Sequence, residues 1–330
     1  MNKWRVVLLC VAWALECGGK EPVKPTDGSI RFVVYFGSRY RGLCVGTMVS
    51  RAAVLTAAVC VTNPVAIVDT RPINVVLGAT YRHTRRGIRV QVTKILIPNL
   101  SSVPGERGYL MEKSAAVLLL KRKVPDVLME IPVRPITIDY MGDTVLVLQD
   151  DCIMPGWHFF YKGDTIYPVQ RFLLQRNMRI QSLNIVKKAV YCETLTLKFQ
   201  KALSNLGFHG LIDNSASVCV RDPEKTAMPC HGMYGSPLVC QGKVVGMMMS
   251  PDAQWTNCTG FSNMIHLLRS AWLRDYFVCV SKLFDVEQAD VKDWISMKKA
   301  IYEDASGERY DYVNTLYDRL YSVEDDEEED

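Results

Sequence analysis

Residues 230–240 read Cys230-His231-Gly232-Met233-Tyr234-Gly235-Ser236-Pro237-Leu238-Val239-Cys240, and this stretch decides the fold. It places a glycine-containing turn and a short apolar run between two cysteines. Cysteine-flanked apolar segments also occur at residues 44–50 (CVGTMVS), 55–60 (LTAAVC) and 152–157 (CIMPGW). Further β-rich or alternating runs lie at Phe32–Phe36, Val75–Leu77, Ile88–Ile97, Ala115–Leu120, Val145–Leu148 and Lys243–Met249. Many short strands at even spacing, separated by turns, predict a barrel or a sandwich.

Taken together, these segments resemble the chymotrypsin/trypsin-like serine proteases (peptidase family S1) in their order and spacing. Residues 44–50 look like the family's Cys-Gly-Gly-Ser-Leu-Ile-Ser, and residues 152–157 look like its Cys-x-x-x-Gly-Trp-Gly. Residues 230–240 look like the family's Gly-Asp-Ser-Gly-Gly-Pro-Leu-Val-Cys. The resemblance implies an all-β domain over residues 28–278. It would contain two antiparallel Greek-key β-barrels, trypsin-like, with a C-terminal helix near Leu267–Phe277.

Three positions at which the family carries its catalytic triad hold other residues here. Residues 55–60 resemble the segment that places His before a half-cystine, and the His position is Val59. Residues 114–119 resemble the Asp-Ile-Ala-Leu-Leu strand, and the Asp position is Ser114; the nucleophile position is Tyr234. Acyl transfer needs a hydroxyl nucleophile, an imidazole that takes its proton and a carboxylate that orients the imidazole. We therefore predict that the chain is not an enzyme.

Two further positions bear on activation and substrate binding. The family's Asp before the nucleophile, which pairs with the new N-terminus after cleavage, is Met233 here. The floor of the specificity pocket is Met228, so no carboxylate awaits a basic side chain. We predict neither zymogen cleavage nor a conventional substrate cleft. Ser236 as a displaced nucleophile is the weaker alternative, because its position matches a glycine of the motif and no His is placed to serve it.

The chain contains 11 cysteines, and such a number in a secreted chain predicts disulfides. The resemblance implies the pairs Cys44–Cys60, Cys152–Cys240, Cys192–Cys219 and Cys230–Cys258. Two cysteines outside this set have alternative fates. If a signal peptide is cut after Ala14, a Cys17–Cys279 bridge would tie the two ends of the domain together. If the cut follows Gly19, Cys279 becomes a candidate for intermolecular pairing.

The N-terminus predicts secretion. Lys3 and Arg5 precede the apolar run Val6–Leu15, which is too short to span a bilayer, so residues 1–19 are interpreted as a signal peptide. No later segment has 18 uncharged apolar residues, and we predict a soluble extracellular protein without a membrane span. Asn99-Leu100-Ser101 is a candidate glycosylation site on a predicted loop.

Charge is distributed unevenly along the chain. The formal net charge is +4, yet residues 301–330 carry 12 acidic and two basic side chains. Residues 279–302 are predicted to form a helical extension, and residues 303–330 are predicted to be a disordered acidic tail. A basic body with an acidic tail suggests attraction of a polyanion or a tail that folds back on the body. The alternative of equal weight is that both charges only aid solubility.

Other binding chemistry is weakly indicated. A basic cluster could bind heparin-like polymers, although a solvated loop is the better explanation; it consists of Arg82, Arg85, Arg86 and Arg89. The five histidines show no metal-ligand spacing, so we predict no metal, no cofactor and no nucleic-acid partner.

Three functions remain open from the sequence. The first is a secreted, non-catalytic serine protease homologue that acts by binding or regulation, as a cofactor or decoy in a protease cascade. Its partner would be a secreted protein such as an active protease or an inhibitor. The second is an active S1 serine-type endopeptidase. The third is a disulfide-linked structural secretory protein.

Overall fold

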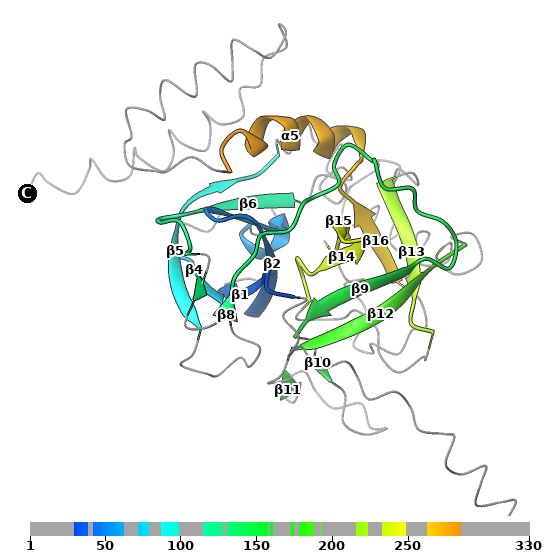
Figure 1. Ribbon diagram of the computed structural model, residues 1–330, viewed down its shortest axis with the longest axis horizontal. Coiled ribbons are helices and arrows are strands. Elements are labelled where there is room, and N and C mark those ends of the chain that lie inside the picture. Colours follow the sequence, from blue (N-terminus) through cyan, green and yellow to red (C-terminus); the bar gives the residue numbers. More distant parts are fainter. Residues whose placement is uncertain are drawn as a thin grey trace, which may run out of the picture.

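The computed structural model describes residues 30–38, 42–62, 72–78, 87–98, 115–125, 127–128, 131–157, 159–160, 173–174, 178–187, 192, 216–223, 233–248 and 263–284. These residues form two closed, six-stranded antiparallel β-barrels, which lie side by side in Figure 1 beneath an α-helix. The predicted all-β fold with two antiparallel barrels and a C-terminal helix is confirmed. No helix in the described ranges is long and apolar enough to cross a membrane.

The first barrel has the closed strand order β1-β2-β3-β6-β5-β4. Its strands are β1 (Val33–Ser38), β2 (Gly42–Ser50), β3 (Ala53–Ala57), β4 (Asn74–Leu77), β5 (Ile88–Leu96) and β6 (Ala115–Leu120). All six residues of β6 are buried, whereas much of β5 alternates between buried and exposed side chains. This difference arises because β6 is apolar on both faces and β5 carries polar residues on one.

The second barrel repeats the connectivity of the first, with the closed order β12-β13-β16-β15-β14-β9. Its strands are β9 (Asp151–Gly156), β12 (Arg179–Val186), β13 (Ser217–Arg221), β14 (Pro237–Cys240), β15 (Lys243–Met247) and β16 (Asn263–Leu267). Two small two-stranded sheets accompany the barrels, β7 (Val127–Leu128) with β8 (Ile131–Pro132) and β10 (Phe159–Phe160) with β11 (Leu173–Leu174).

Three disulfides join pairs that the resemblance implies. Cys44–Cys60 ties β2 to the turn after β3, Cys152–Cys240 links β9 to β14, and Cys192–Cys219 reaches β13. Bridges of this kind typically stabilise a small domain by about 2–5 kcal/mol each. Disulfides of this type are a feature of proteins that fold in an oxidising compartment.

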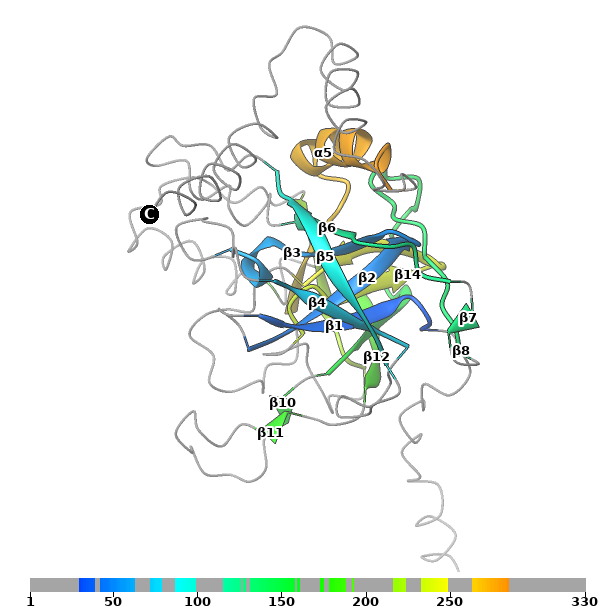
Figure 2. The ribbon, with the colours of Figure 1, turned by 90° about the vertical axis from the view of Figure 1, so that its left-hand side faces the viewer.

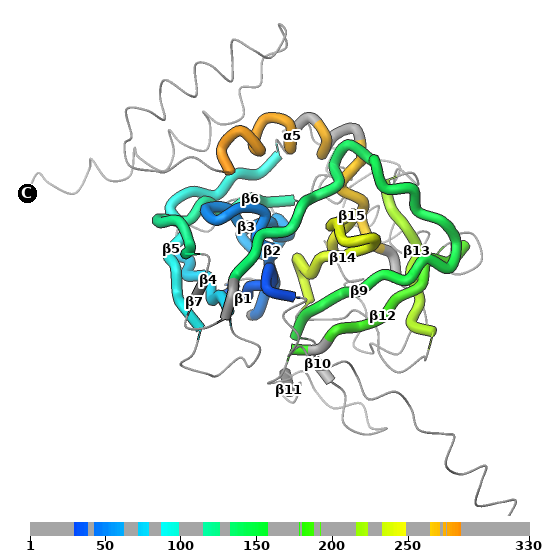
Figure 3. The backbone as a smooth tube through the Cα atoms, viewed as in Figure 1, coloured from blue at the N-terminus to red at the C-terminus, as the bar shows by residue number. Residues whose placement is uncertain are grey.

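The segment between the barrels is hydrogen-bonded to both of them. Figure 3 traces it from β8 past α5 to the start of β9. The Ile136 N–H donates to the Met48 carbonyl of the first barrel at 2.9 Å. The Val244 N–H of the second barrel donates to the Thr137 carbonyl at 3.0 Å. The barrels are therefore joined by a docked linker.

Helix α5 (Ala271–Ser281) covers one end of the first barrel, as Figure 2 shows. Leu273 and Phe277 are fully buried in the main core. The Tyr276 hydroxyl donates to the Leu96 carbonyl at 2.8 Å, and burial raises the pKa of that phenol. The helix begins and ends four residues later than the predicted Leu267–Phe277, because Leu267 still pairs with Gly246 in the sheet.

One predicted strand is wrong. Val145–Leu148 alternates in sequence as a strand would, but it forms an irregular segment that leads into a turn at Leu148. Val145 and Leu148 are 70% and 61% exposed. Its backbone is held by side chains: Gln241 donates to the Val145 carbonyl, and the Val147 N–H donates to Asp150. Of the predicted helical extension at residues 279–302, only residues 279–284 are described, at the end of α5 and just after it; residues 285–302, the acidic tail and the signal peptide lie outside the described residues.

Candidate functional site

Val59 lies in a short 3₁₀ turn, Ala58–Cys60, that follows directly after β3. Its side chain is partly buried and packs against the main core. The Cys44–Cys60 disulfide fixes the end of this turn. A hydrocarbon side chain therefore occupies the place at which the resemblance expects an imidazole, and it offers no proton acceptor.

Residues 233–236 form a tight turn just before β14. The Ser236 N–H donates to the Met233 carbonyl at 2.9 Å, which closes the turn around Tyr234 and Gly235. Gly235 has a φ of +80°, in the region that favours glycine. A Cβ atom at Gly235 would lie 2.1 Å from the Val45 carbonyl oxygen and 2.4 Å from Thr56 Oγ1. The turn therefore requires glycine at this position.

Main-chain atoms hold this turn against the first barrel. The Val45 N–H donates to the Tyr234 carbonyl at 2.8 Å. The same carbonyl oxygen lies 3.8 Å from Cys60 Sγ, in the residue next to Val59. The Val59 and Tyr234 segments are consequently brought together at the junction of the barrels.

The third triad position is not placed, but the residue after it is described. Ser114 lies outside the described residues, but Ala115 begins β6 and pairs with Ala57 of β3. Ala57 is two residues before Val59. The register therefore directs the start of β6 toward the same junction.

Tyr234 and Met233 are both buried. Tyr234 is 5% exposed and belongs to the main core, whereas Met233 is fully buried in the core of the second barrel. Near Met233 the described neighbours include Met154 and Leu238. An apolar environment thus surrounds the position at which the family's activation carboxylate would lie.

Ser236 is sealed inside the protein. Its side chain is 0% exposed, and its hydroxyl has no hydrogen-bond partner in the structure. A Cβ atom at Gly156 would lie 2.6 Å from Ser236 Oγ and 3.1 Å from Met233 Cε, so these residues pack closely around the hydroxyl. This hydroxyl is not placed to meet a substrate.

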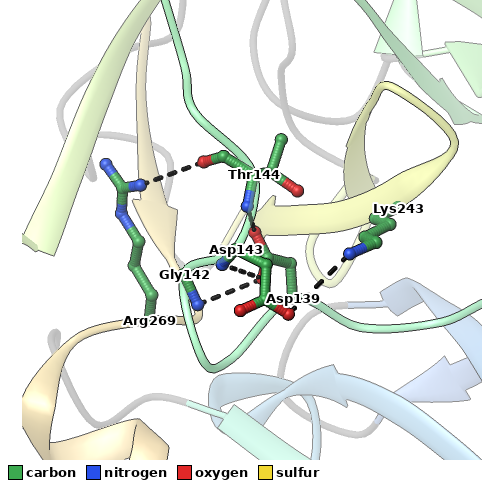
Figure 4. Close-up of polar contacts among 6 residues, drawn as sticks. All are labelled: Asp139, Gly142, Asp143, Thr144, Lys243 and Arg269. Atoms are coloured by element: carbon green, nitrogen blue, oxygen red, sulfur yellow. Dashed lines mark hydrogen bonds and ion pairs between the residues drawn. The ribbon is translucent and has the colours of Figure 1, made fainter.

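A set of hydrogen bonds that the sequence motifs did not reveal, centred on Asp139, holds the turn of the linker near the second barrel (Figure 4). The buried Asp139 carboxylate accepts hydrogen bonds from the backbone N–H groups of Gly142, Asp143 and Thr144 at 3.0, 2.9 and 2.9 Å. Burial by itself would raise the pKa of Asp139, but hydrogen bonds from the Thr144 side chain and from these N–H groups outweigh it. The pKa of Asp139 is therefore lower than usual. The Asp-x-x-Gly spacing is the local signal that could have indicated this turn.

Several predicted site residues lie outside the described ranges and are not placed. These are Cys17, Arg82, Arg85, Arg86, Asn99, Ser114, Met228, Cys230 and Cys258. Arg89 is exposed on β5, and Cys279 is half-buried in α5. Within the described ranges, no cluster of His, Cys, Asp or Glu could hold a metal ion.

The trypsin family model matches residues 18–265 of the chain. Among characterised proteins, the chain is similar to human Granzyme H, with 26% identity over 258 residues that cover 78% of this chain and 89% of the relative.

Solved structures share the fold at lower identity. A scabies mite inactivated protease paralogue matches with a TM-score of 0.54 and 16% identity, covering 78% of this chain and 93% of that one. Human heparin binding protein matches with a TM-score of 0.54 and 16% identity, covering 79% and 96%. Mouse neuropsin, a serine protease, matches with a TM-score of 0.55 and 18% identity, covering 80% and 99%. The family model, the two barrels and the junction between them establish that the chain belongs to the trypsin family, the chymotrypsin-like serine proteases of peptidase family S1.

Proposed function

We propose that this member of the trypsin family is a secreted, non-catalytic homologue that acts by binding another protein. The observation that carries the proposal is the pair Val59 and Tyr234 at the junction of the barrels. The turn geometry and the neighbouring Cys44–Cys60 disulfide are kept there, while the two side chains cannot perform the reaction. The frame of an active site thus persists without its acid–base groups.

The size of the rate loss expected without the triad side chains supports the proposed inactivity. Loss of a serine protease triad lowers turnover by about 10⁶-fold. At about 1.36 kcal/mol for each factor of ten, this amounts to roughly 8 kcal/mol of barrier. Oxyanion stabilisation alone leaves a residual rate that would not serve digestion or signalling.

Two other ways in which the protein could be catalytic are unfavourable: a different serine nucleophile, and activation by a new N-terminus. Ser236 does not replace the nucleophile, because its hydroxyl is buried against Gly156 and Met233. Activation by a new N-terminus needs a carboxylate before the nucleophile, and Met233 is an apolar side chain in an apolar cluster. We propose that the protein functions without zymogen cleavage.

The disulfides and the predicted signal peptide support secretion. The proposed partner is a secreted protein, such as an active protease or an inhibitor, which a protease-shaped homologue could assist or block. The solved structures with the same fold include one described as an inactivated protease paralogue and one described as a heparin binding protein. At 16% sequence identity, these two structures are evidence for the fold alone.

A fluorophosphonate probe tests the lack of catalysis. We expect no covalent labelling of the native protein under conditions in which an active family member is labelled fully. Labelling at Ser236 or elsewhere would contradict the non-catalytic proposal and favour the endopeptidase alternative. Affinity capture from the native secretion tests the binding role, and enrichment of a protease or a protease inhibitor is the expected result.

A further inference from the structure

We propose that the acidic C-terminal segment of this chain, residues 303–330, docks in a cavity between the two barrels and is held there by Arg31 and Arg134. The inference goes beyond the proposed function, because it concerns a cavity that neither Val59 nor Tyr234 lines. It would make the tail an intramolecular ligand of the domain.

The cavity has a volume of about 440 Å³, which lies within the range of about 300–1,000 Å³ typical of ligand sites. Its walls come from the start of β1, the linker, β9 and the β14–β15 turn. The lining residues are Arg31, Phe32, Arg134, Pro135, Ile136, Asp151, Ile153, Val239, Gln241 and Gly242. Apolar side chains form much of the wall, and charged groups are few, so the cavity favours a ligand with both apolar and anionic parts.

The charges in the cavity favour an anion. Arg31 and Arg134 contribute two cations against the single carboxylate of Asp151. Asp151 Oδ1 already accepts a hydrogen bond from Asn184 Nδ2 at 2.7 Å. Arg31 Nε is buried and has no hydrogen-bond partner in the structure. A buried guanidinium N–H without a partner is costly, and a carboxylate ligand would satisfy it in a planar geometry.

The described chain ends against strand β2, which also contacts the cavity lining. The Ser50 hydroxyl donates a hydrogen bond to the carbonyl of Phe284, the last described residue. Ser50 is two residues after Met48 in β2, a separation of roughly 7 Å along a strand. The Met48 N–H donates to the Phe32 carbonyl at 2.7 Å, and the Met48 carbonyl accepts from Ile136 at 2.9 Å. Phe32 and Ile136 both line the cavity.

The tail can reach the cavity by length alone. Residues 285–302 separate Phe284 from the acidic segment, and 18 residues span roughly 27 Å as a helix. Tethering raises the effective concentration of the segment to the millimolar range for short linkers, so even weak intrinsic binding would populate the docked state.

The tail also has the composition that the cavity favours. Tyrosines alternate with carboxylates in Tyr310-Asp311-Tyr312 and in Tyr317-Asp318, and seven acidic residues follow at 324–330. A tyrosine ring suits the apolar walls, and the adjacent carboxylate suits the two arginines. A separate acidic protein would use the same chemistry, and the experiment below distinguishes it from the tail.

The test uses the full chain in three forms: wild type, a tail variant with every Asp and Glu of residues 303–330 changed to Asn or Gln, and Arg31→Ser/Arg134→Ser. Hydrogen–deuterium exchange is followed in peptides covering residues 30–36 and 131–138. We expect slower exchange in the wild type than in the other two forms, and loss of that difference in 0.5 M salt, at which charges are screened within about 4 Å. Arg122→Ser/Lys123→Ser removes the same charge from an exposed turn and should keep the protection.

A labelled peptide of residues 303–330 supplies the second measurement. We expect it to bind the tail variant, to bind about tenfold more weakly when Arg31→Ser/Arg134→Ser is added, and to bind the wild type poorly because the tail competes. A scrambled peptide of equal composition should bind less well. Equal exchange in the wild type and the tail variant would overturn the proposal. Equal peptide binding by those two forms would also overturn it, and would assign the cavity to a separate acidic protein.

Discussion

The backbone N–H of Val45 donates a hydrogen bond to the carbonyl of Tyr234 at 2.8 Å, and this contact joins the two barrels at the place where the family performs its chemistry. Val45 belongs to β2, and its own carbonyl accepts from Thr56 Oγ1 at 2.7 Å. Strands β2 and β3 of the first barrel therefore position the Tyr234 turn. Because the contact uses main-chain atoms, it does not depend on a catalytic side chain at residue 234.

The first prediction concerns Gly235. Gly235→Ala should lower the free energy of unfolding by more than 3 kcal/mol, because its Cβ would lie 2.1 Å from the Val45 carbonyl oxygen in addition to the positive φ. Gly242→Ala is the matched control: its φ is +77° but nothing lies within 4 Å, so only about 1–2 kcal/mol should be lost. Chemical denaturation measures both. Equal losses would contradict the close packing at the junction.

A second prediction concerns the position of the lost activation carboxylate. Met233→Asp should destabilise the fold by roughly 3–5 kcal/mol, since it buries an unpaired charge among apolar side chains. Met233→Leu conserves volume and should cost less than about 1.5 kcal/mol. Thermal and urea unfolding of both variants provide the comparison. A tolerated aspartate would show that the site can still hold a carboxylate.

The third prediction separates two buried serines. Ser236→Ala should leave stability unchanged or raise it slightly, because the Ser236 hydroxyl has no hydrogen-bond partner in the structure. Ser38→Ala should cost about 1–2 kcal/mol, since the Ser38 hydroxyl donates to the Cys60 carbonyl at 2.7 Å. Denaturation midpoints of the two variants test this difference, and a clear loss at Ser236 would reveal a bonded hydroxyl.

Acid sensitivity should depend on Asp139. The pKa of Asp139 is lowered in the folded state, so its contribution to stability is present above the unfolded pKa of about 3.9 and is lost as pH falls through the folded pKa. Asp139→Asn should destabilise the protein at pH 7 by about 1–3 kcal/mol, because it leaves one backbone N–H without an acceptor. The difference between variant and wild type should shrink below pH 4. A constant difference would contradict this role.

Lys94 should affect the stability of the fold at alkaline pH. Burial lowers its pKa from 10.5 to about 8. The folded state therefore releases its proton at lower pH than the unfolded state does, and wild-type stability should gain from Lys94 as pH rises from 8 toward 10.5. Lys94→Met should be more stable than the wild type at pH 7, with a smaller advantage at pH 9.5. Urea denaturation midpoints of both proteins at the two pH values test this prediction, and an equal advantage at both would contradict it.

The sequence was most informative where cysteines adjoin strand motifs. The pairing of Cys44 with Cys60 and of Cys152 with Cys240 follows from the family resemblance, because the flanking motifs fix which strands those cysteines occupy. Alternating residues were a poorer guide at Val145–Leu148, where side chains of Gln241 and Asp150 hold the backbone in place of a neighbouring strand. The alternating pattern does not show the local Val147–Asp150 hydrogen bond, and it cannot reveal the contact from Gln241, which lies 96 positions from Val145.

The cavity could not be predicted from the sequence either. Its two arginines, Arg31 and Arg134, are more than one hundred positions apart and carry no motif. The two arginines line the same cavity because the linker is hydrogen-bonded to β2 through Ile136 and Met48. The close approach of Gly156 to Ser236 is likewise a product of packing between strands.

The repeated strand order of the two barrels has a consequence for how such chains are assembled. Each barrel closes with strands from one continuous half of the polypeptide, and the linker between them includes the exposed turn at Val147 and Leu148. A backbone cut at that turn would leave every barrel strand with its neighbours. Related chains could therefore exchange whole halves by recombination there, provided that the Val45–Tyr234 contact is restored.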